Sequence, residues 1–212
     1  MDVSYTPDLS VNSLFSRAWE IFREHLGFVL AVFLIYALLT GGVNYFSDDL
    51  LGGLGSLIGI IIAGPVTAGA YAVALGLVRG EQPEIGEVFA GFREFGRALG
   101  VYILQSLAIV VGMILLIIPG IYIAVALAPA MYLVLNDSLG VTDTLRKAYA
   151  MTEGYRWQIF IVGLALILVN ILGLIALIVG IIFTGAFSLL VGAVLFDELD
   201  KAYNAESVEY SM

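Results

Sequence analysis

Ionisable residues able to do chemistry are few in this sequence, and they lie outside its long apolar runs. His25 is the only histidine, and there is no cysteine, so a disulfide framework and a cysteine-based metal site are excluded. Acid–base catalysis by His25 would need a carboxylate partner in a pocket, and Glu24, its neighbour in sequence, points to another face of a helix. We therefore expect no catalytic residue, no metal site and no cofactor.

Polar but uncharged side chains inside the apolar runs are the next candidates. Gln105 and Asn170 carry amides, which in lipid normally hydrogen-bond a neighbouring helix. Alternatively, the two amides line a polar seam together with Thr67, Thr184 and Ser188. The runs hold no Asp, Glu, Lys or Arg, which argues against a proton-coupled pump but leaves open a neutral pore or a lipid path.

Two prolines interrupt apolar runs near their middles. Pro65 and Pro129 each remove one backbone hydrogen bond and are expected to kink a helix. The freed carbonyls could bind an ion or a substrate, as in transporters with broken helices. The alternative is a kink that is filled by local packing.

Basic and aromatic residues flank the apolar runs. They are suited to bind anionic lipid headgroups, at about 1 kcal/mol per basic residue near the surface. The alternative is that they only set topology, and interleaved carboxylates weaken the case for lipid specificity. The candidates for headgroup contact are Arg17, Trp19, Arg23, Arg93, Arg97, Arg146, Lys147 and Trp157.

Composition identifies the solvent of this chain as lipid. Of 212 residues, 61% are hydrophobic and 13% are charged, and the mean hydropathy is +1.02. A soluble domain has about a quarter of its residues charged. The net charge of −9 argues against nucleic acid, whose phosphates bind clustered Lys and Arg. Membrane lipids are the expected partners, and a protein partner or a homo-oligomer is left open.

The length of the runs predicts six membrane spans. Residues 98–136 carry no charge, and one helix of about 40 residues would be about twice as long as the hydrocarbon core is thick. Pro119-Gly120 is the natural break, so we expect a tight hairpin there, and a similar one at Gly180. The predicted spans are 26–46, 54–78, two within 98–136, 158–179 and 181–196.

The basic residues predict an orientation. With six spans, all nine Lys and Arg residues fall on the same side. Cytoplasmic loops of membrane proteins carry an excess of Lys and Arg. We therefore expect a multi-pass protein of the cell membrane with both termini in the cytoplasm.

Polar segments before alternate spans predict an internal repeat. Apolar residues recur at helical spacing in each segment, which is typical of an amphipathic helix. At one constant offset, Phe15, Glu20 and Arg23 match Phe89, Glu94 and Arg97. We expect an all-α integral membrane protein forming a single membrane domain, 1–212, with six transmembrane helices as three repeats of an interfacial amphipathic helix plus a helical hairpin. The repeats are about 10–79, 83–136 and 141–200, followed by an acidic tail, 201–212.

Two stretches carry a family resemblance: "IIPGIYIAVALAPAMYLV" and "VTDTLRKAYAMTEGYRWQIF". They resemble a family of uncharacterised bacterial and archaeal six-span membrane proteins related to the membrane domain of glycerophosphoryl diester phosphodiesterases. The matching residues are Ile118, Pro119, Gly120, Asp143, Leu145, Gly154, Trp157 and Phe160. In those phosphodiesterases catalysis belongs to a separate soluble barrel, so the resemblance implies a fold and no activity.

Two hypotheses for function follow. The first is a non-enzymatic membrane scaffold whose amphipathic helices bind lipids or a partner. The alternative is a transporter or channel for a small solute or a lipid that uses the proline-kinked second and fourth spans. An enzyme acting on lipids ranks last, because the sequence lacks paired carboxylates within the spans.

Overall fold

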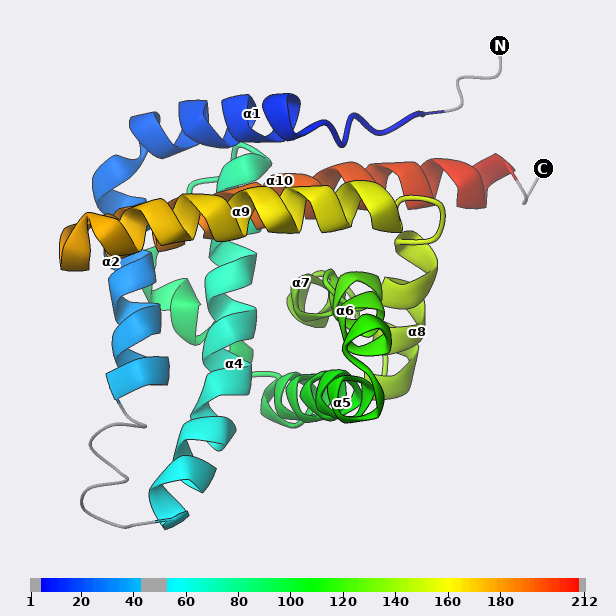
Figure 1. Cartoon of the computed structure of the whole chain (residues 1–212), viewed down its shortest axis with the longest axis horizontal. Helices are drawn as coiled ribbons and strands as arrows, with labels where there is room; N and C mark the ends of the chain where they lie inside the picture. The colour runs from blue at the N-terminus through cyan, green and yellow to red at the C-terminus, as the bar shows by residue number, and fades with distance from the viewer. Residues whose placement is uncertain (1–4, 43–52, 210–212) are drawn as a thin grey trace.

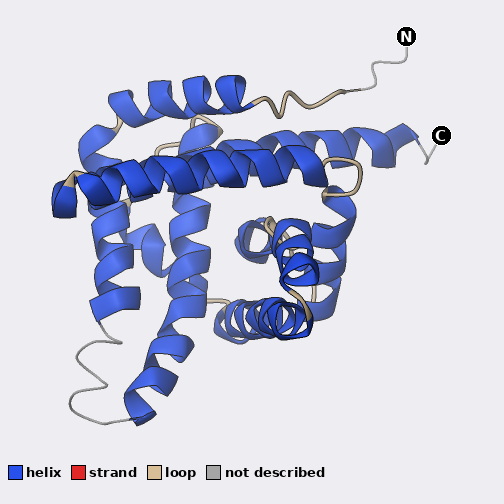
Figure 2. Cartoon of the chain, viewed as in Figure 1, coloured by secondary structure: helices blue, strands red, loops and turns tan. Residues whose placement is uncertain are grey.

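The computed structural model describes residues 5–42 and 53–209, and this part of the chain is helical without a strand (Figure 2). The all-α fold class is thereby confirmed. The elements are α1 (Val11–Glu24), α2 (Leu26–Ala37), the π-helical turn η1 (Leu38–Gly42), α4 (Gly53–Val78), the 3-10 helix η2 (Ile85–Phe92), α5 (Phe95–Leu115), α6 (Ile117–Ala126), α7 (Ala130–Asn136), α8 (Val141–Met151), α9 (Arg156–Ile175) and α10 (Leu177–Glu209).

Several of these helices are suited to a lipid environment. Five helical segments are long and apolar enough to cross a membrane, or six if α1 and α2, which meet at a bend of 99°, count as one. Residues 43–46 of the predicted first span lie outside the described part. On the hairpin ends, Ile118 is 81% exposed and Ile175 is 73% exposed. Apolar surface of this extent indicates lipid contact, so the chain is a multi-pass integral membrane protein.

The helices run in three directions. Figure 1 shows α2 and α4 running up and down the view, α9 and α10 running across it, and α5 to α7 seen end-on. Helices α4 and α10 contact each other at the centre. There Val66, Val73, Leu190 and Phe196 are fully buried. In contrast, α5 and α9 leave most of their apolar surface exposed, so they form the outside of the bundle.

The hairpin predicted at Pro119-Gly120 turns earlier than expected. Helix α5 ends at Leu115, Leu116 is extended with φ −164° and ψ 144°, and Pro119 lies in the first turn of α6. Proline is tolerated there because N–H groups of the first turn have no intrahelical partner. Gly120 serves close packing instead, since a Cβ on Gly112 would lie 2.9 Å from the Gly120 Cα.

The turn predicted at Gly180 is displaced in the same direction. Helix α9 ends at Ile175, Ala176 forms its cap, and Gly180 lies in the first turn of α10. A Cβ on Gly173 would lie 2.9 Å from the Gly180 carbonyl oxygen. In both hairpins, therefore, a pair of glycines lets the two backbones approach each other. The three-fold repeat itself stays a prediction.

The amphipathic segments before the spans differ from one another. α1 and α8 are single helices, as predicted, and each buries part of one face: Leu14, Ala18 and Phe22 on α1, and Thr144, Ala148 and Met151 on α8. The segment after Pro83 is instead divided into η2 and the start of α5. η2 lies along α4, because Gly69 faces the Val88 carbonyl and Gly91 faces the Pro65 carbonyl so closely that a Cβ at either glycine would overlap it.

Two other predicted boundaries also change. The fourth span is broken between α6 and α7 at Leu127–Pro129. The sixth does not end near Phe196, since α10 continues to Glu209 and includes most of the predicted tail. Residues 210–212 lie outside the described part.

Candidate functional site

Charged side chains gather where α1, α4, α7, α8 and α10 meet. On α10, Asp197 and Asp200 lie one turn apart, and their side chains are only 4% and 11% exposed. Residues three apart share a helix face, so both carboxylates face the bundle rather than the solvent. A buried carboxylate needs a cationic partner, and the neighbouring elements supply these partners. We call the whole cluster the charged junction; it consists of Arg17, Arg79, Asp137, Lys147, Asp197, Glu198, Asp200 and Lys201.

Arg17 connects α1 to α10 and to the end of α4. Its Nη2 lies 2.9 Å from Asp197 Oδ2 and its Nη1 lies 2.9 Å from Glu198 Oε1. Nη2 also donates to the Val78 carbonyl at 3.2 Å. The planar guanidinium suits this task because it offers several donors in a fixed fork. Lys201, one turn further along α10, adds a 2.7 Å bond to Asp197.

Arg79, which follows α4, connects the end of α7 to the charged junction. Its Nη2 lies 3.0 Å from Asp200 Oδ2, its Nε 3.5 Å from Asp197 Oδ1, and its Nη1 donates to Asn136 Oδ1 at 2.7 Å. Asn136 ends α7. One arginine therefore bridges the ends of α4 and α7 to Asp197 and Asp200, which lie within α10.

Lys147 of α8 completes the junction. Its Nζ lies 2.7 Å from Asp137 and 3.9 Å from Asp200, and 5.3 Å from the centre of the Tyr203 ring. The charged members therefore come from segments far apart in sequence, and the predicted second repeat adds Asn136, which accepts a hydrogen bond from Arg79.

The N-terminal segment is fastened to the same place. The Tyr5 hydroxyl donates to Glu198 Oε2. Burial raises the pKa of Tyr5 to about 12, and the hydrogen bond to Glu198 is the second-largest cause of the shift. The phenol therefore remains a protonated donor at neutral pH.

The ion pairs of the charged junction hold neighbouring helices together. Four cations, Arg17, Arg79, Lys147 and Lys201, face four carboxylates. The carboxylates are largely buried and the cations partly so. An intact pair of this kind adds little net stability, but removing the partner of a buried charge is costly. Within residues 5–42 and 53–209, no group of three His, Cys, Asp or Glu side chains is placed to hold a metal ion.

Three of the predicted headgroup contacts are used inside the protein. Arg17 and Lys147 belong to the charged junction. The side chain of Arg97 is 17% exposed, and its guanidinium donates to the carbonyls of Leu139, at 3.3 Å, and Val134. These three cations make their contacts within the protein, and the Arg17 side chain is still 35% exposed.

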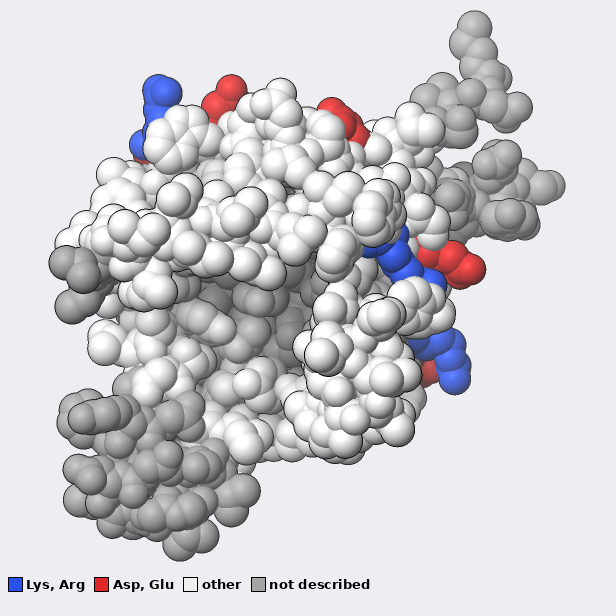
Figure 3. Space-filling view, viewed as in Figure 1, with Lys and Arg blue, Asp and Glu red and all other residues white. Residues whose placement is uncertain are grey.

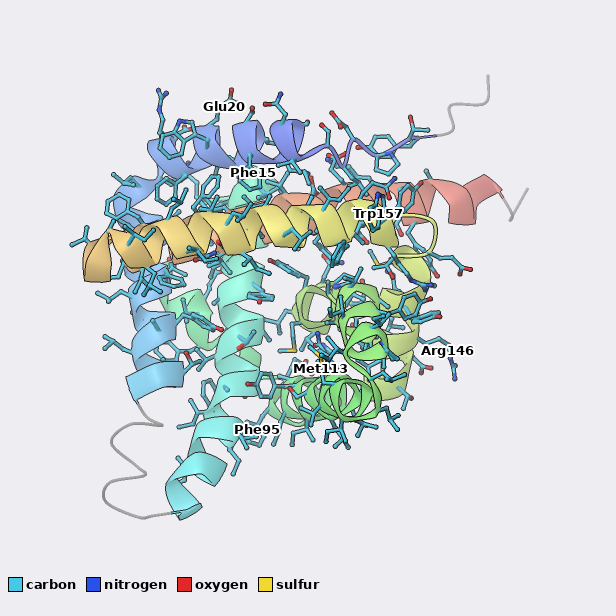
Figure 4. All side chains as sticks on the ribbon, viewed as in Figure 1. Phe15, Glu20, Phe95, Met113, Arg146 and Trp157 are labelled. Carbon is cyan, nitrogen blue, oxygen red and sulfur yellow. The ribbon has the colours of Figure 1, made fainter. Side chains whose placement is uncertain are left out.

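The remaining predicted headgroup contacts lie on the outside. Arg23, Arg93 and Arg146 are exposed, and Figure 4 shows Arg146 extending away from α8. Trp19 is 50% exposed and Trp157 is 69% exposed. The charged side chains visible in Figure 3 lie at the periphery, around α1 and beside α8, and leave an uncharged surface between them. Sequence spacing alone could not separate these residues from Arg17, Arg97 and Lys147, which have partners within the protein.

The predicted polar seam is divided among three places. Asn170 Nδ2 donates to Ser188 Oγ and to the Leu166 carbonyl, both at 2.8 Å, which joins α9 to α10. The Ser188 hydroxyl donates to the Thr184 carbonyl at 2.7 Å, and the Thr184 hydroxyl to the Gly180 carbonyl at 3.0 Å. These polar groups are satisfied by the helix pair that contains them.

Gln105 lies at the break between α6 and α7. Its Nε2 donates to the Leu127 carbonyl at 3.0 Å, and the Thr152 hydroxyl donates to the Ala126 carbonyl at 3.0 Å. Pro129 begins α7. Carbonyls near this break thus receive donors from α5 and from the end of α8.

The other two members of the predicted set, Pro65 and Thr67, lie on α4. Thr67 is buried, and Pro65 is covered by Gly91 of η2. The structure therefore brings Asn170, Thr184 and Ser188 together, and places Gln105 with Pro129.

An apolar pocket adjoins the helix break. Its volume is about 190 Å³, and its walls come from α4, α7, α9 and α10 together with Ala128 and Pro129. Three rings form a stack beside it, since the Tyr71 and Tyr132 centroids lie 4.3 Å apart and the Tyr132 and Phe196 centroids 5.1 Å apart. Sequence reasoning did not predict this pocket.

Sequence reasoning also missed Asp197 and Asp200, because the last span was ended at Phe196. A usable signal was present. Both aspartates continue the helical spacing of Leu190 and Val194, which are core residues, so a longer helix would have placed them on the buried face.

Comparisons with models of protein families, with curated proteins and with solved structures find no match in any of the three. The resemblance to the six-span family is therefore still a prediction.

Proposed function

We propose that this protein is a non-enzymatic membrane scaffold that binds anionic lipids at one face of a closed helical bundle. The observation that carries the proposal is the division of its cations. Arg17, Arg79 and Lys147 form ion pairs within the charged junction, whereas Arg23 and Arg146 are exposed. Internally paired cations hold the helices together. The exposed ones, of which Arg146 makes only a surface pair with Asp143 at 3.3 Å, can attract phosphate headgroups. Membership of the six-span family is part of the same proposal.

The orientation proposed for the bundle places the charged junction in the cytoplasm. The junction joins basic residues from α1, α8 and α10 and from the end of α4, which supports their lying on a common side. Positive charge is enriched on the cytoplasmic side of membrane proteins. Because the chain has no cysteine, single cysteines can report the sidedness directly.

The labelling experiment uses two positions. Ala176→Cys lies at the turn between α9 and α10, and Arg146→Cys lies on α8. A membrane-impermeant maleimide applied to intact cells is expected to label Ala176→Cys, and to label Arg146→Cys only after permeabilisation. The reverse pattern would overturn the orientation.

Lipid binding is tested by native mass spectrometry of protein extracted from vesicles that contain equal phosphatidylglycerol and phosphatidylcholine. The wild type is expected to retain phosphatidylglycerol preferentially. Replacing Arg23, Arg93 and Arg146 together by glutamine should reduce the preference, by up to about fivefold for each arginine if each contributes about 1 kcal/mol. The matched lysine variant keeps the charge and should behave as the wild type. Equal retention of both lipids by the wild type would refute the proposal.

A transporter or channel is the alternative, and the helix break at Pro129 beside the pocket is the observation that favours it. Its difficulty is that the Asn170 amide and the Leu127 carbonyl already have partners. Solute flux in liposomes that is lost in Pro65→Ala or Asn170→Leu would establish transport in place of the scaffold.

A further inference from the structure

The pocket between α4, α7, α9 and α10 owes its space to backbone features. The chain interrupts its helix just before Pro129, and α9 carries Gly163 on the wall of the pocket. A Cβ added at Gly163 would meet no atom within 4 Å. On α10, Gly192 leaves room for the Tyr132 hydroxyl, which donates to the Leu189 carbonyl at 3.4 Å. The space is therefore built into the fold and does not depend on one side-chain rotamer.

The chemistry of the walls selects an apolar occupant. Ile159, Val162, Leu166 and Leu195 contribute hydrocarbon, and the hydroxyl of Tyr132 is already bonded. A polar solute entering such a site would lose hydrogen bonds to water without replacement. An apolar cavity of about 150 Å³ is large enough to bind benzene in a soluble protein, and this pocket is somewhat larger.

Lipid acyl chains are apolar molecules that surround the pocket at high concentration. Helices α9 and α10 are candidate spans, and Leu164, Ile167 and Leu168 of α9 are exposed apolar residues. Figure 3 shows the molecule hollowed beneath α9. Along α9 the pocket extends from Ile159 to Leu166, about 10 Å of helix, and it begins one turn after Arg156. A lipid chain descending from the headgroup level follows this direction.

We propose that this pocket binds one acyl chain of a membrane phospholipid. The inference deepens the proposed lipid interaction and rests on it for the identity of the ligand class. It concerns the hydrocarbon chain, however, and is independent of the exposed arginines. A chain held between α7 and α9 would join the hairpin of α5 and α6 to that of α9 and α10 through a lipid.

The experiment is photo-crosslinking in vesicles of phosphatidylethanolamine and phosphatidylglycerol that contain a phospholipid with a diazirine in one acyl chain. Modified peptides are mapped by mass spectrometry. Crosslinks are expected within 128–132 and 192–199, in addition to the exposed face of α5, which serves as the internal reference. In Gly163→Phe, whose ring fills the pocket, the pocket crosslinks should fall by roughly tenfold or more, equivalent to about 1.4 kcal/mol of lost binding.

The matched control is Gly27→Phe. Gly27 is also a helical glycine with no atom within 4 Å of an added Cβ, and it lies on α2, away from the pocket. Its crosslinks should equal those of the wild type, and size-exclusion chromatography checks that both variants fold. Pocket crosslinks that persist in Gly163→Phe, or that are missing from the wild type while α5 is labelled, would overturn the inference. Neither result would affect the scaffold proposal, which depends on the arginines.

Discussion

Replacing Asp197 by alanine removes the central acceptor of the charged junction. The side chain of Asp197 is 4% exposed and lies 2.9 Å from Arg17, 2.7 Å from Lys201 and 3.5 Å from Arg79. The arginines keep other acceptors, because Arg17 still bonds Glu198 and Arg79 still bonds Asp200. The variant therefore leaves cations under-paired without isolating them completely.

The magnitude follows from these contacts. A hydrogen bond to a charged group contributes about 1.5–3 kcal/mol, and this range applies to the partly buried bond to Arg17. The bond to Lys201 is an i,i+4 pair with an exposed lysine and contributes about 0.3–0.5 kcal/mol. Breaking a fully buried pair costs about 3–5 kcal/mol, and the remaining partners of Arg17 and Arg79 reduce this. We expect Asp197→Ala to lower the free energy of unfolding by about 2–3 kcal/mol.

The assay is reversible unfolding in mixed micelles, with helix content measured by circular dichroism. Asp143→Ala is the matched control, since this aspartate pairs at 3.3 Å with Arg146, whose side chain is 82% exposed. Loss of a surface pair at a helix start costs at most about 1 kcal/mol. If the two variants lose equal stability, the charged junction does not hold the helices together as its geometry indicates.

A double-mutant cycle separates the pair from its surroundings. Arg17→Met combined with Asp197→Leu removes both charges, so neither is left buried alone. The double variant should be more stable than the sum of the single changes implies, because the cost of a broken buried pair comes mainly from the unpaired partner. Strict additivity would contradict this account.

Two further predictions concern helix packing. Gly91→Ala should cost about 3 kcal/mol or more, or abolish folding, because the new Cβ overlaps the Pro65 carbonyl and two backbones must separate; Gly86→Ala, which meets no atom within 4 Å, should be neutral. Gln105→Leu removes the donor to the Leu127 carbonyl and should cost about 0.6–2 kcal/mol by the same unfolding assay.

The contrary outcomes are clear in both cases. A stable Gly91→Ala variant would mean that η2 does not lie against α4 at this glycine. A Gln105→Leu variant with unchanged stability would mean that the α6–α7 break needs no donor from α5.

Local properties of the sequence account for what could be predicted. Long uncharged runs predict membrane helices, and helical periodicity before two of them predicts α1 and α8, because hydropathy and period are read from neighbouring residues. The residues at which the hairpins turn could not be predicted in this way. Pro119 breaks a helix interior but is accommodated in a first turn, so the chain reverses at Leu116 instead.

The candidate site depends on contacts between distant segments. Arg17 and Arg146 look alike in sequence, each a basic residue on an amphipathic helix. Arg17 nevertheless pairs with the buried Asp197 of another helix, whereas Arg146 pairs only with Asp143 of its own helix and its side chain is 82% exposed. Gly163 and Gly192 likewise resemble any other glycines in apolar helices until their backbones are seen beside one pocket. Composition and periodicity therefore establish a helical membrane protein. The pairing of its charges and the position of its pocket arise when the hairpins cross, because only then do segments far apart in the chain share a low-dielectric interior in which charges must pair.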